Sequence, residues 1–383
     1  MRGRLSLFAL AALLMPAQQV PLGQIIDDVV CAKDASQHYA LYLPPNYTPD
    51  RQWPLILAFD PGGRGKCPLE HYLAAAEKYG YIVAGSNVSR NGSWSVSMGA
   101  AQAMGADVTA RFSIDEKRIY TAGMSGGARV AMGLAMGSPK VIAGVIASSA
   151  GYPDSKPRKT VPFLVFGTAG NEDFNWLEMR SLDHALTSPH HLAVFPGGHV
   201  WLPSDLAVEA VEWLNLQAMR EGRMPRNQKW IDSLFAARQD KANAIADEWE
   251  RCQRLETLAA DFKDLHDIGV VTATAAALRK TKPVKELQKK DQSEEFQERR
   301  LLGDILDWEQ GLQVPEKRSE SLARLIDIWK RMDTQAKSEE DTAARRIARR
   351  VSRGLAMGAS DRTKDPEYLS LLSKYRPARM GQR

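Results

Sequence analysis

Short apolar runs and helix-like patterns alternate along roughly the first 225 residues of the chain. The inner apolar runs are continuous rather than alternating with polar residues, which is typical of parallel strands covered on both faces. Together with the helical patterns between them, they predict a doubly wound, mostly parallel α/β sheet. The predicted strands are residues 39–43, 54–59, 81–85, 118–123, 141–148, 162–167 and 192–195.

One connection between predicted strands is unusually short. Only the segment 151–160 separates the strand ending near residue 148 from the next strand. That length is too small for an ordinary crossover helix with its turns. A crossover helix is therefore not expected at this position.

The pattern changes after the segment "REGRMPR" at residues 220–226. Only six of the 28 glycines follow residue 225, and long, charged, helix-rich stretches take over. In "SLARLIDIWKRM" the apolar side chains recur at helical spacing, which indicates ordinary amphipathic packing. We therefore predict an α/β domain over residues 20–225 and an all-α helical domain over residues 226–383.

The first 19 residues have the pattern of a signal peptide. "MRGR" is a positive segment, and "LSLFALAALLM", an apolar stretch of eleven residues, follows it. This run is too short to span a bilayer but has the usual length of the apolar part of a signal peptide. The chain is thus predicted to be exported, to the periplasm or the medium, without a membrane span; a buried N-terminal helix is the alternative.

Composition and charge exclude several function classes. The chain is 44% hydrophobic and 25% charged, with a net charge of +5, which is ordinary for a globular protein. No basic run with interleaved aromatic residues indicates a nucleic-acid partner. The three cysteines lack CxxC spacing and a nearby set of histidines, so neither a metal nor a cofactor is expected.

The segment "TAGMSGGARV" contains the strongest chemical signal. Gly123, Ser125 and Gly127 form a G-x-S-x-G pattern that follows a predicted strand and begins a helix. In such an elbow the serine hydroxyl is exposed at the carboxyl edge of the sheet, and the flanking glycines avoid collisions. The alternative is that these small residues only allow close packing of helix and strand.

A serine nucleophile needs a base, and the base needs an orienting acid. Of the seven histidines, His199 alone follows the last predicted strand in a Gly-rich turn at the same sheet edge. The acid should follow the preceding strand, where Glu172 and Asp173 are adjacent. Asp173 is preferred because Phe174 can bury the loop beside it, and Glu172 is the alternative.

Two elements are candidates for binding an oxyanion. The backbone N–H of Gly126 lies at the start of the helix after Ser125. A second N–H should come from the loop "FDPGGRG", in which Pro61 has no N–H, so Gly62 or Gly63 must donate. This loop is also a strong turn signal in its own right.

Residues 25–220 resemble the α/β-hydrolase fold, and most of all the polyhydroxybutyrate-depolymerase and feruloyl-esterase branch of secreted esterases. The segments that carry the resemblance are "LPPNY", "PLILAFDPGGRG", "GYIVAGSN", "RIYTAGMSGGARVA", "GTAGNEDFN" and "PGGHVW". The resemblance implies that Ser125 is the nucleophile, His199 the base and Asp173 the acid. It also implies an oxyanion hole formed by Gly126 and the loop of Gly62 and Gly63.

The sequence departs from this branch in two places. The usual His-Gly after the third strand is here Asp60-Pro61, which leaves the second oxyanion donor open. The short 151–160 segment lacks the insertion that forms a cap in many relatives. Substrate selection is then expected from the segment 86–94, with Asn87 and an aromatic wall at Trp94, or from the helical domain; ordinary packing is the alternative for Trp94.

The favoured function is an exported serine hydrolase that cleaves carboxylic esters, small or polymeric, through an acyl-enzyme. A serine peptidase of the same fold is one alternative, because the same triad cleaves amides. A non-catalytic binding or scaffold protein with a vestigial hydrolase domain is another.

Two further expectations depend on the fold. Cys31 and Cys67 belong to neighbouring regions in it and are predicted to form a disulfide, whereas Cys252 is predicted to be a buried free thiol. The helical domain is expected to hang away from the sheet edge and bind a protein or polymer partner. The alternative is that it lies beside the site.

Overall fold

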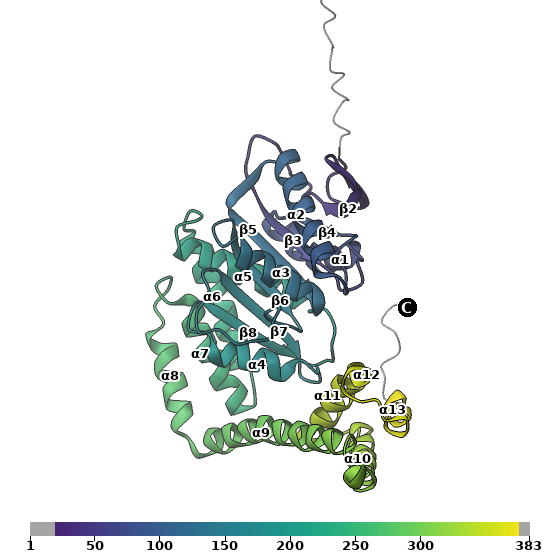
Figure 1. The fold of residues 1–383 in the computed structure, drawn as a ribbon. Coiled ribbons are helices and arrows are strands. Elements are labelled where there is room, and N and C mark those ends of the chain that lie inside the picture. Colours follow the sequence, from purple (N-terminus) through teal and green to yellow (C-terminus); the bar gives the residue numbers. More distant parts are fainter. Residues whose placement is uncertain (1–19, 375–383) are drawn as a thin grey trace, which may run out of the picture.

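The computed structural model describes residues 20–374, so the predicted signal peptide lies outside the described residues. The chain forms one eight-stranded sheet with helices on both faces, followed by a helical region (Figure 1). The strands are β1 (Ile25–Cys31), β2 (Asp34–Tyr42), β3 (Trp53–Phe59), β4 (Ile82–Ser86), β5 (Ile114–Met124), β6 (Ile142–Ser148), β7 (Leu164–Gly170) and β8 (His190–Phe195).

The strand order is β1-β2-β4-β3-β5-β6-β7-β8, which is that of the α/β-hydrolase fold. β2 pairs antiparallel with β1 and β4, and every other pairing is parallel. The predicted mostly parallel α/β sheet is therefore confirmed. β1 is the strand that the sequence pattern missed, because it is a half-exposed edge strand without a continuous apolar run.

Helices cover the two faces of the sheet and enclose two apolar cores. The sheet-flanking helices are α1 (Lys66–Tyr79), α2 (Trp94–Arg111), α3 (Gly126–Gly137), α4 (Trp176–Ala185) and α5 (Ser204–Arg220). Side chains of α2, α3 and α4 contribute to one core, and those of α1 and α5 to the other. Between β6 and β7 the chain has no helix, as the short connection predicted.

The cysteine prediction is wrong in one part. Cys31 is buried in the core beneath α2, whereas Cys67 lies on α1 and packs against the core on the opposite face. The sheet separates the two thiols, and both are free. Cys252 is a buried free thiol, as predicted, and its Sγ lies 3.5 Å from the carbonyl oxygen of Ala275.

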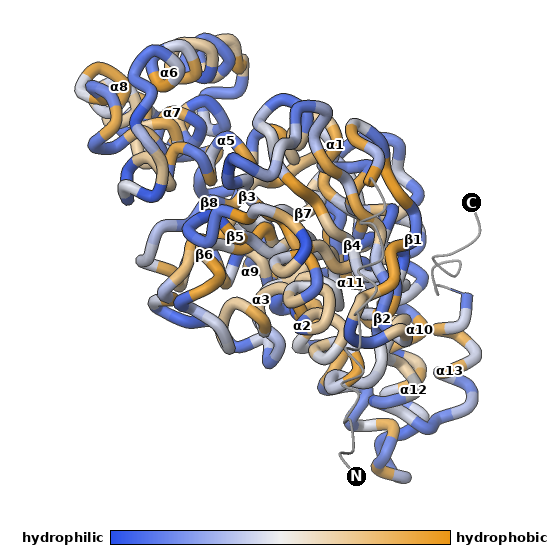
Figure 2. The backbone as a smooth tube through the Cα atoms, turned by 90° about the horizontal axis from the view of Figure 1, so that it is seen from above, coloured by the Kyte–Doolittle hydropathy of each residue, from blue (hydrophilic) through white to orange (hydrophobic). Residues whose placement is uncertain are grey.

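The C-terminal region is helical throughout its regular structure, as expected. Its helices are α6 (Gln228–Asn243), α7 (Glu248–Phe262), α8 (Gly269–Lys280), α9 (Lys282–Gly311), α10 (Pro315–Ala336), α11 (Ala343–Met357), α12 (Ala359–Arg362) and α13 (Pro366–Ser373). Seen from above, α6, α7 and α8 lie at one corner of the molecule and α10, α12 and α13 at another (Figure 2).

The helical region does not hang free, so that expectation is wrong. Leu216 and Met219 of α5 share a buried apolar cluster with residues of α6, α7 and α8. Arg180 of α4 forms ion pairs with Asp291 and Glu295 of α9 at 2.9 and 2.7 Å. These contacts bury apolar surface and pair charges at both ends of the region, which fixes it against the sheet domain.

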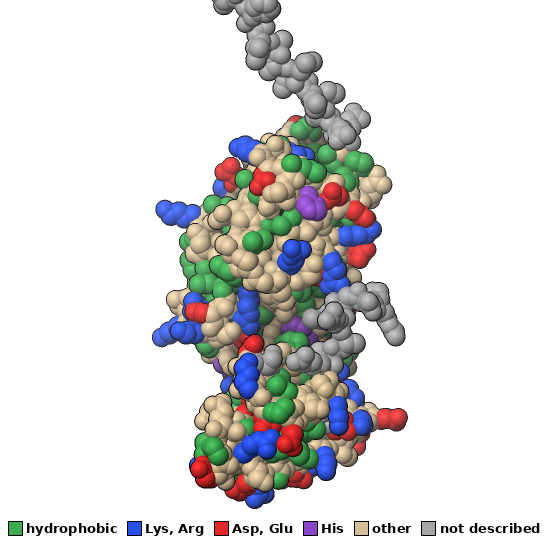
Figure 3. All heavy atoms as spheres, turned by 45° about the vertical axis from the view of Figure 1, so that its right-hand side comes forward, with side chains coloured by type: hydrophobic (Ala, Val, Ile, Leu, Met, Phe, Trp, Pro, Cys, Tyr) green, Lys and Arg blue, Asp and Glu red, His purple; other side chains and the backbone are tan. Residues whose placement is uncertain are grey.

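The surface of the helical region mixes the two signs of charge. On the face in Figure 3, basic and acidic side chains are interspersed over it rather than gathered by sign. Among residues 20–374, no helix has the length and apolar character needed to cross a membrane.

Candidate active site

The elbow between β5 and α3 places Ser125 in a conformation that few L-residues adopt. Its φ is 54° and its ψ is −120°, a sparsely populated region whose cost of about 1–3 kcal/mol must be met by the surrounding structure. The Ser125 N–H donates to the carbonyl of Ser148 on β6 at 2.8 Å, which helps to hold the turn. The hydroxyl is half-buried at the carboxyl edge of the sheet.

The two flanking glycines are sterically required. A Cβ on Gly127 would lie 1.9 Å from the carbonyl oxygen of Phe59, and one on Gly123 would lie 2.2 Å from the carbonyl oxygen of Gly127. Real Cβ atoms do not approach oxygen this closely. The glycines of the G-x-S-x-G pattern therefore allow β3, β5 and α3 to meet around the serine.

Ser125, His199 and Asp173 are joined by hydrogen bonds, although 26 residues separate the acid from the histidine and 74 separate the serine from it. His199 Nδ1 lies 2.8 Å from Asp173 Oδ1, and His199 Nε2 lies 2.8 Å from Ser125 Oγ. A carboxylate only accepts, so Nδ1–H donates to it and Nε2 is left to accept from the serine hydroxyl. This tautomer is the one that a general base requires.

The acid and the histidine are shielded from water. Asp173 is fully buried, and His199 is only 9% exposed. The ring of Phe174 stacks on the imidazole with 3.9 Å between ring centroids. The backbone N–H of Asn175 donates to the same Oδ1 at 2.8 Å, while Asp173 Oδ2 has no hydrogen-bond partner among the described residues.

Glu172, the alternative acid, points elsewhere. Its carboxylate accepts hydrogen bonds from Arg349 of α11 at 2.8 and 2.9 Å and lies 3.2 Å from Arg345. The structure thus brings Asp173, and not its neighbour, to His199.

The loop after β3 uses its N–H groups internally. Gly62 N–H donates to the side chain of Asp60 at 2.8 Å, and Gly63 N–H donates to the Asp60 carbonyl at 3.1 Å. In this structure neither predicted donor is free, whereas Gly126 N–H begins α3, where intrahelical partners are lacking. The predicted role of Gly62 or Gly63 would require the loop to rearrange.

Asp60 organises this loop from a fully buried position. It also accepts from the Arg64 guanidinium at 2.9 and 3.0 Å and from Trp201 Nε1 at 2.9 Å. Burial alone would raise the pKa of this carboxyl, but the hydrogen bonds from Arg64, Trp201 and the Gly62 N–H outweigh it and hold the pKa below its ordinary value. Asp60 therefore joins the loop after β3 to the loop of His199.

The two residues proposed for a substrate pocket have other contacts. Asn87 accepts from Gly65 N–H at 2.9 Å and donates to the carbonyl of Asp27 at 2.9 Å, which ties loops together. Trp94 begins α2 and is 47% exposed, and its ring lies against Gly133 of α3. Their predicted part in substrate binding stays a prediction.

Sequence reasoning missed Asn91, which lies over the start of α3. A Cβ on Gly126 would be 1.8 Å from Asn91 Oδ1, so the asparagine amide occupies the space that this glycine leaves open. Its backbone N–H donates to the carbonyl of Pro61 at 2.9 Å, which holds it beside the loop after β3. Only the "RNG" turn marks the position in the sequence, and a turn carries no sign of chemistry.

Comparisons with known proteins found similarity at the level of the fold. No protein-family model and no curated protein sequence matches the chain. Among solved structures, a ferulic acid esterase is similar at 14% identity and a TM-score of 0.41, over 50% of this chain and 96% of that one.

Two further solved structures are similar to the same degree. Est1E from Butyrivibrio proteoclasticus shares 13% identity at a TM-score of 0.39, over 48% of this chain and 95% of its own. FphF, a fluorophosphonate-binding serine hydrolase of Staphylococcus aureus, shares 14% sequence identity at a TM-score of 0.41. The match covers 51% of this chain and 99% of that one. At such low similarity the chemistry has to be argued from the side chains of this chain.

Proposed function

We propose that this chain is a serine hydrolase that cleaves carboxylic esters through an acyl-enzyme, with Ser125 as nucleophile, His199 as base and Asp173 as acid. The observation that carries the proposal is the unbroken series of two 2.8 Å hydrogen bonds from Asp173 through His199 to the strained Ser125. A structural serine would need neither the strain nor the buried imidazole and carboxylate beside it.

In the first half-reaction Ser125 Oγ attacks the ester carbonyl carbon while its proton passes to His199 Nε2. The buried Asp173 carboxylate, with one oxygen otherwise unpaired, stabilises the imidazolium that forms. The imidazolium then gives its proton to the leaving alkoxide, and the C–O bond to the alcohol breaks. In the second half His199 takes a proton from water, whose oxygen attacks the acyl carbon. The bond to Ser125 Oγ then breaks as the imidazolium returns that proton to Oγ, which releases the carboxylic acid and free Ser125.

The oxyanion needs at least two donors. Gly126 N–H is the first. Because the N–H groups of Gly62 and Gly63 are engaged in their own turn, we assign the second to the side-chain amide of Asn91. A Cβ on Gly126 would lie 1.8 Å from Asn91 Oδ1 but 3.6 Å from its Nδ2, so this role requires the amide to turn its NH₂ group toward the oxyanion.

The test is covalent labelling of the full chain with a fluorophosphonate probe, together with hydrolysis of a p-nitrophenyl ester. Ser125→Ala should abolish both while the circular dichroism spectrum is unchanged, because the side chain is small and half-buried. Asp173→Asn should lower kcat on the order of 10⁴-fold through the wrong imidazole tautomer.

Glu172→Gln is the matched control for the acid, and it should retain far more activity than Asp173→Asn. Equal ester turnover in Ser125→Ala and the parent protein would refute the nucleophile assignment. Labelling without ester turnover, but with cleavage of an anilide, would favour the peptidase alternative. No labelling at all would favour the non-catalytic one.

The proposed location is outside the cytoplasm, on the strength of the N-terminal pattern. N-terminal sequencing of the protein recovered from its native host is the direct check, since removal of about the first 19 residues is expected.

A further inference from the structure

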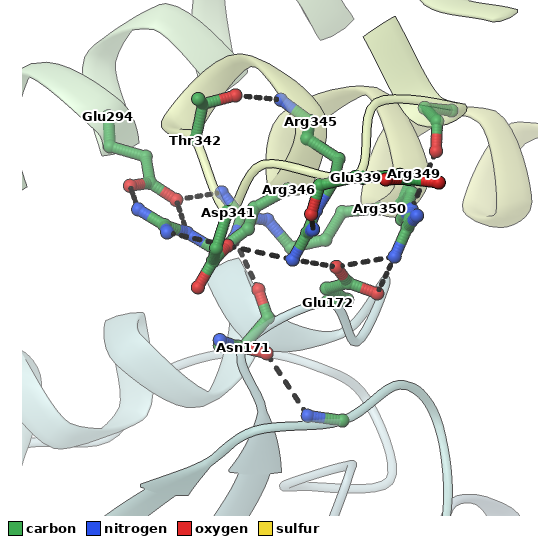
Figure 4. Close-up of polar contacts among 12 residues, drawn as sticks. Asn171, Glu172, Glu294, Glu339, Asp341, Thr342, Arg345, Arg346, Arg349 and Arg350 are labelled. Atoms are coloured by element: carbon green, nitrogen blue, oxygen red, sulfur yellow. Dashed lines mark hydrogen bonds and ion pairs between the residues drawn. The ribbon is translucent and has the colours of Figure 1, made fainter.

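The carboxyl edge of β7 carries both the acid and a contact with the C-terminal helices. Arg350 of α11 donates to the carbonyl oxygen of Asn171 at 2.6 Å, and Arg349 holds the Glu172 carboxylate, as described above. Asn171 and Glu172 are the two residues that precede Asp173. Figure 4 shows these arginines pointing from α11 down onto this short segment.

The same segment is bonded to the loop of the histidine. Glu172 N–H donates to the carbonyl of Gly197 at 2.8 Å, and Asn171 Oδ1 accepts from Gly197 N–H at 3.1 Å. A Cβ on Gly170 would lie 2.3 Å from the Gly197 carbonyl oxygen, so the two loops are in close contact. A shift of residues 171–172 would therefore move the acid and the histidine relative to each other.

The arginines that grip this segment are themselves held firmly. Arg350 is 1% exposed, pairs with Glu298 at 2.6 Å and Glu294 at 2.8 Å on α9, and stacks over the Trp176 ring at 4.2 Å. Buried, charge-assisted hydrogen bonds of this kind are short and directional. Arg350 therefore holds the carbonyl of Asn171 from a buried position between α9 and α11.

The charge arrangement has a second effect at the acid. Glu172 is largely buried, with 12% of its side chain exposed, and stands next to Asp173 in the chain. Without the arginines it would be a second, uncompensated carboxylate beside the triad. Arg345 and Arg349 pair with it at 3.2 and 2.8 Å and balance its charge.

We propose that Arg349, Arg345 and Arg350 of α11 are positioning residues for the reaction, which hold residues 171–172 so that Asp173 stays aligned with His199. This proposal depends on the proposed function and adds that the helical region is part of the catalytic apparatus. A misplacement of about 1 Å in such an arrangement can cost on the order of 10²-fold in rate.

The experiment uses Arg349→Met in the full chain, since Arg349 is partly exposed and the variant should fold. We expect kcat to fall roughly 10- to 100-fold with KM nearly unchanged. The rate of fluorophosphonate labelling should fall in parallel while its end-point amplitude, which counts folded sites, stays at the parent level. Arg349→Lys should restore part of the rate, because it keeps the charge without the forked geometry.

Two comparisons separate positioning from general stability. Arg331→Met removes an exposed arginine on α10 that pairs with Asp327 at 3.3 Å, and it should leave both labelling rate and turnover unchanged. In a Glu172→Gln background the effect of Arg349→Met should be clearly smaller, since the partner is already altered.

The proposal is overturned if Arg349→Met labels and turns over at the parent rate, or if only the labelling amplitude falls. An effect of full size in the Glu172→Gln background would overturn it as well. Failure of the parent protein to label at Ser125 would instead refute the proposed function, so the two failures are distinguishable.

Discussion

At the scale of single residues, the site combines a fixed triad with an unusual environment for the oxyanion. Asp60 stands after β3, where the sequence resemblance predicts histidine, and its carboxylate accepts from the N–H of Gly62. Asn91, on the loop after β4, lies beside Gly126, and we propose that its amide replaces that N–H. The presence of Asp60 after β3 is thus matched by Asn91, about thirty residues later in the chain.

Asn91→Ala should lower kcat roughly 10²-fold with little change in KM, because removal of one oxyanion donor acts mainly on the transition state. Steady-state hydrolysis of a p-nitrophenyl ester measures it. Ser93→Ala, a change of an exposed polar side chain on the same loop, is the matched control and should be neutral. If Asn91→Ala keeps the parent kcat, Gly62 N–H must leave Asp60 during the reaction.

At the scale of elements, the elbow is the part of the structure least tolerant of added volume. Two of the glycines of α3 have very different surroundings. Gly127 faces the carbonyl oxygen of Phe59 at a distance that forbids a Cβ, whereas Gly137, the last residue of the helix, has no heavy atom within 4 Å of that position.

Gly127→Ala should lower the free energy of unfolding by about 2 kcal/mol or more, because β3 and α3 must separate to admit the methyl group. Gly137→Ala should change it by less than about 1 kcal/mol, and in the stabilising direction. Urea unfolding followed by circular dichroism compares the two. Similar values for both variants would contradict the close contact at the elbow.

Much of this level was predictable from the sequence, for physical reasons that differ between elements. Continuous apolar runs indicate buried parallel strands. The glycines of the elbow are needed for steric reasons within a few residues of Ser125, so a short sequence pattern predicts them. β1, an edge strand in which six of the seven residues are exposed or half-exposed, leaves no such mark. The choice of Asp173 over Glu172 followed from one neighbouring residue, Phe174, which indeed stacks on the histidine.

At the scale of the whole molecule, the sequence did not indicate how the helical region contacts the sheet domain. The pattern in α11 shows charge at helical spacing, which alone is typical of a solvated face. The arginines of α11 pair with Glu172, which lies 177 residues before Arg349, and with carboxylates on α9. Only the folded structure therefore shows that these arginines contact the loop of Asp173 and do not form a solvated face. The prediction that the helical domain stands away from the sheet was wrong for this reason.

The contact between α9 and α11 should make stability depend on pH. Burial raises the pKa of Glu298 to about 7, while Arg350 and Arg299 oppose the shift and Glu294 adds to it. Between the ordinary pKa of a glutamate carboxyl and about pH 7, Glu298 is protonated in the folded protein but ionised in the unfolded chain. The free energy of unfolding should therefore fall as pH rises through this window, by up to about 1.4 kcal/mol per pH unit.

Glu298→Gln removes this titration and should flatten the pH dependence between about pH 5 and 7. Urea unfolding of both proteins at several pH values gives the slope of the free energy of unfolding against pH for each. Subtracting the two slopes cancels the contributions of other groups. Arg350 keeps Glu294 as a partner in the variant, at 2.8 Å, so the helical region should still fold. Parallel slopes in the two proteins would show that Glu298 is ionised in the fold.

The grip of α11 on the loop of the acid also has a consequence for the order of events during biosynthesis. Arg349 and Glu172 are separated by 177 residues, so the acid loop leaves the ribosome long before the helix that holds it. At ordinary elongation rates of about 5–20 residues per second the delay is roughly 10 to 35 s. On the proposed assignment, a nascent chain would carry its nucleophile, base and acid through that interval without the alignment by α11, and would gain full hydrolytic activity only when nearly all of it has been made.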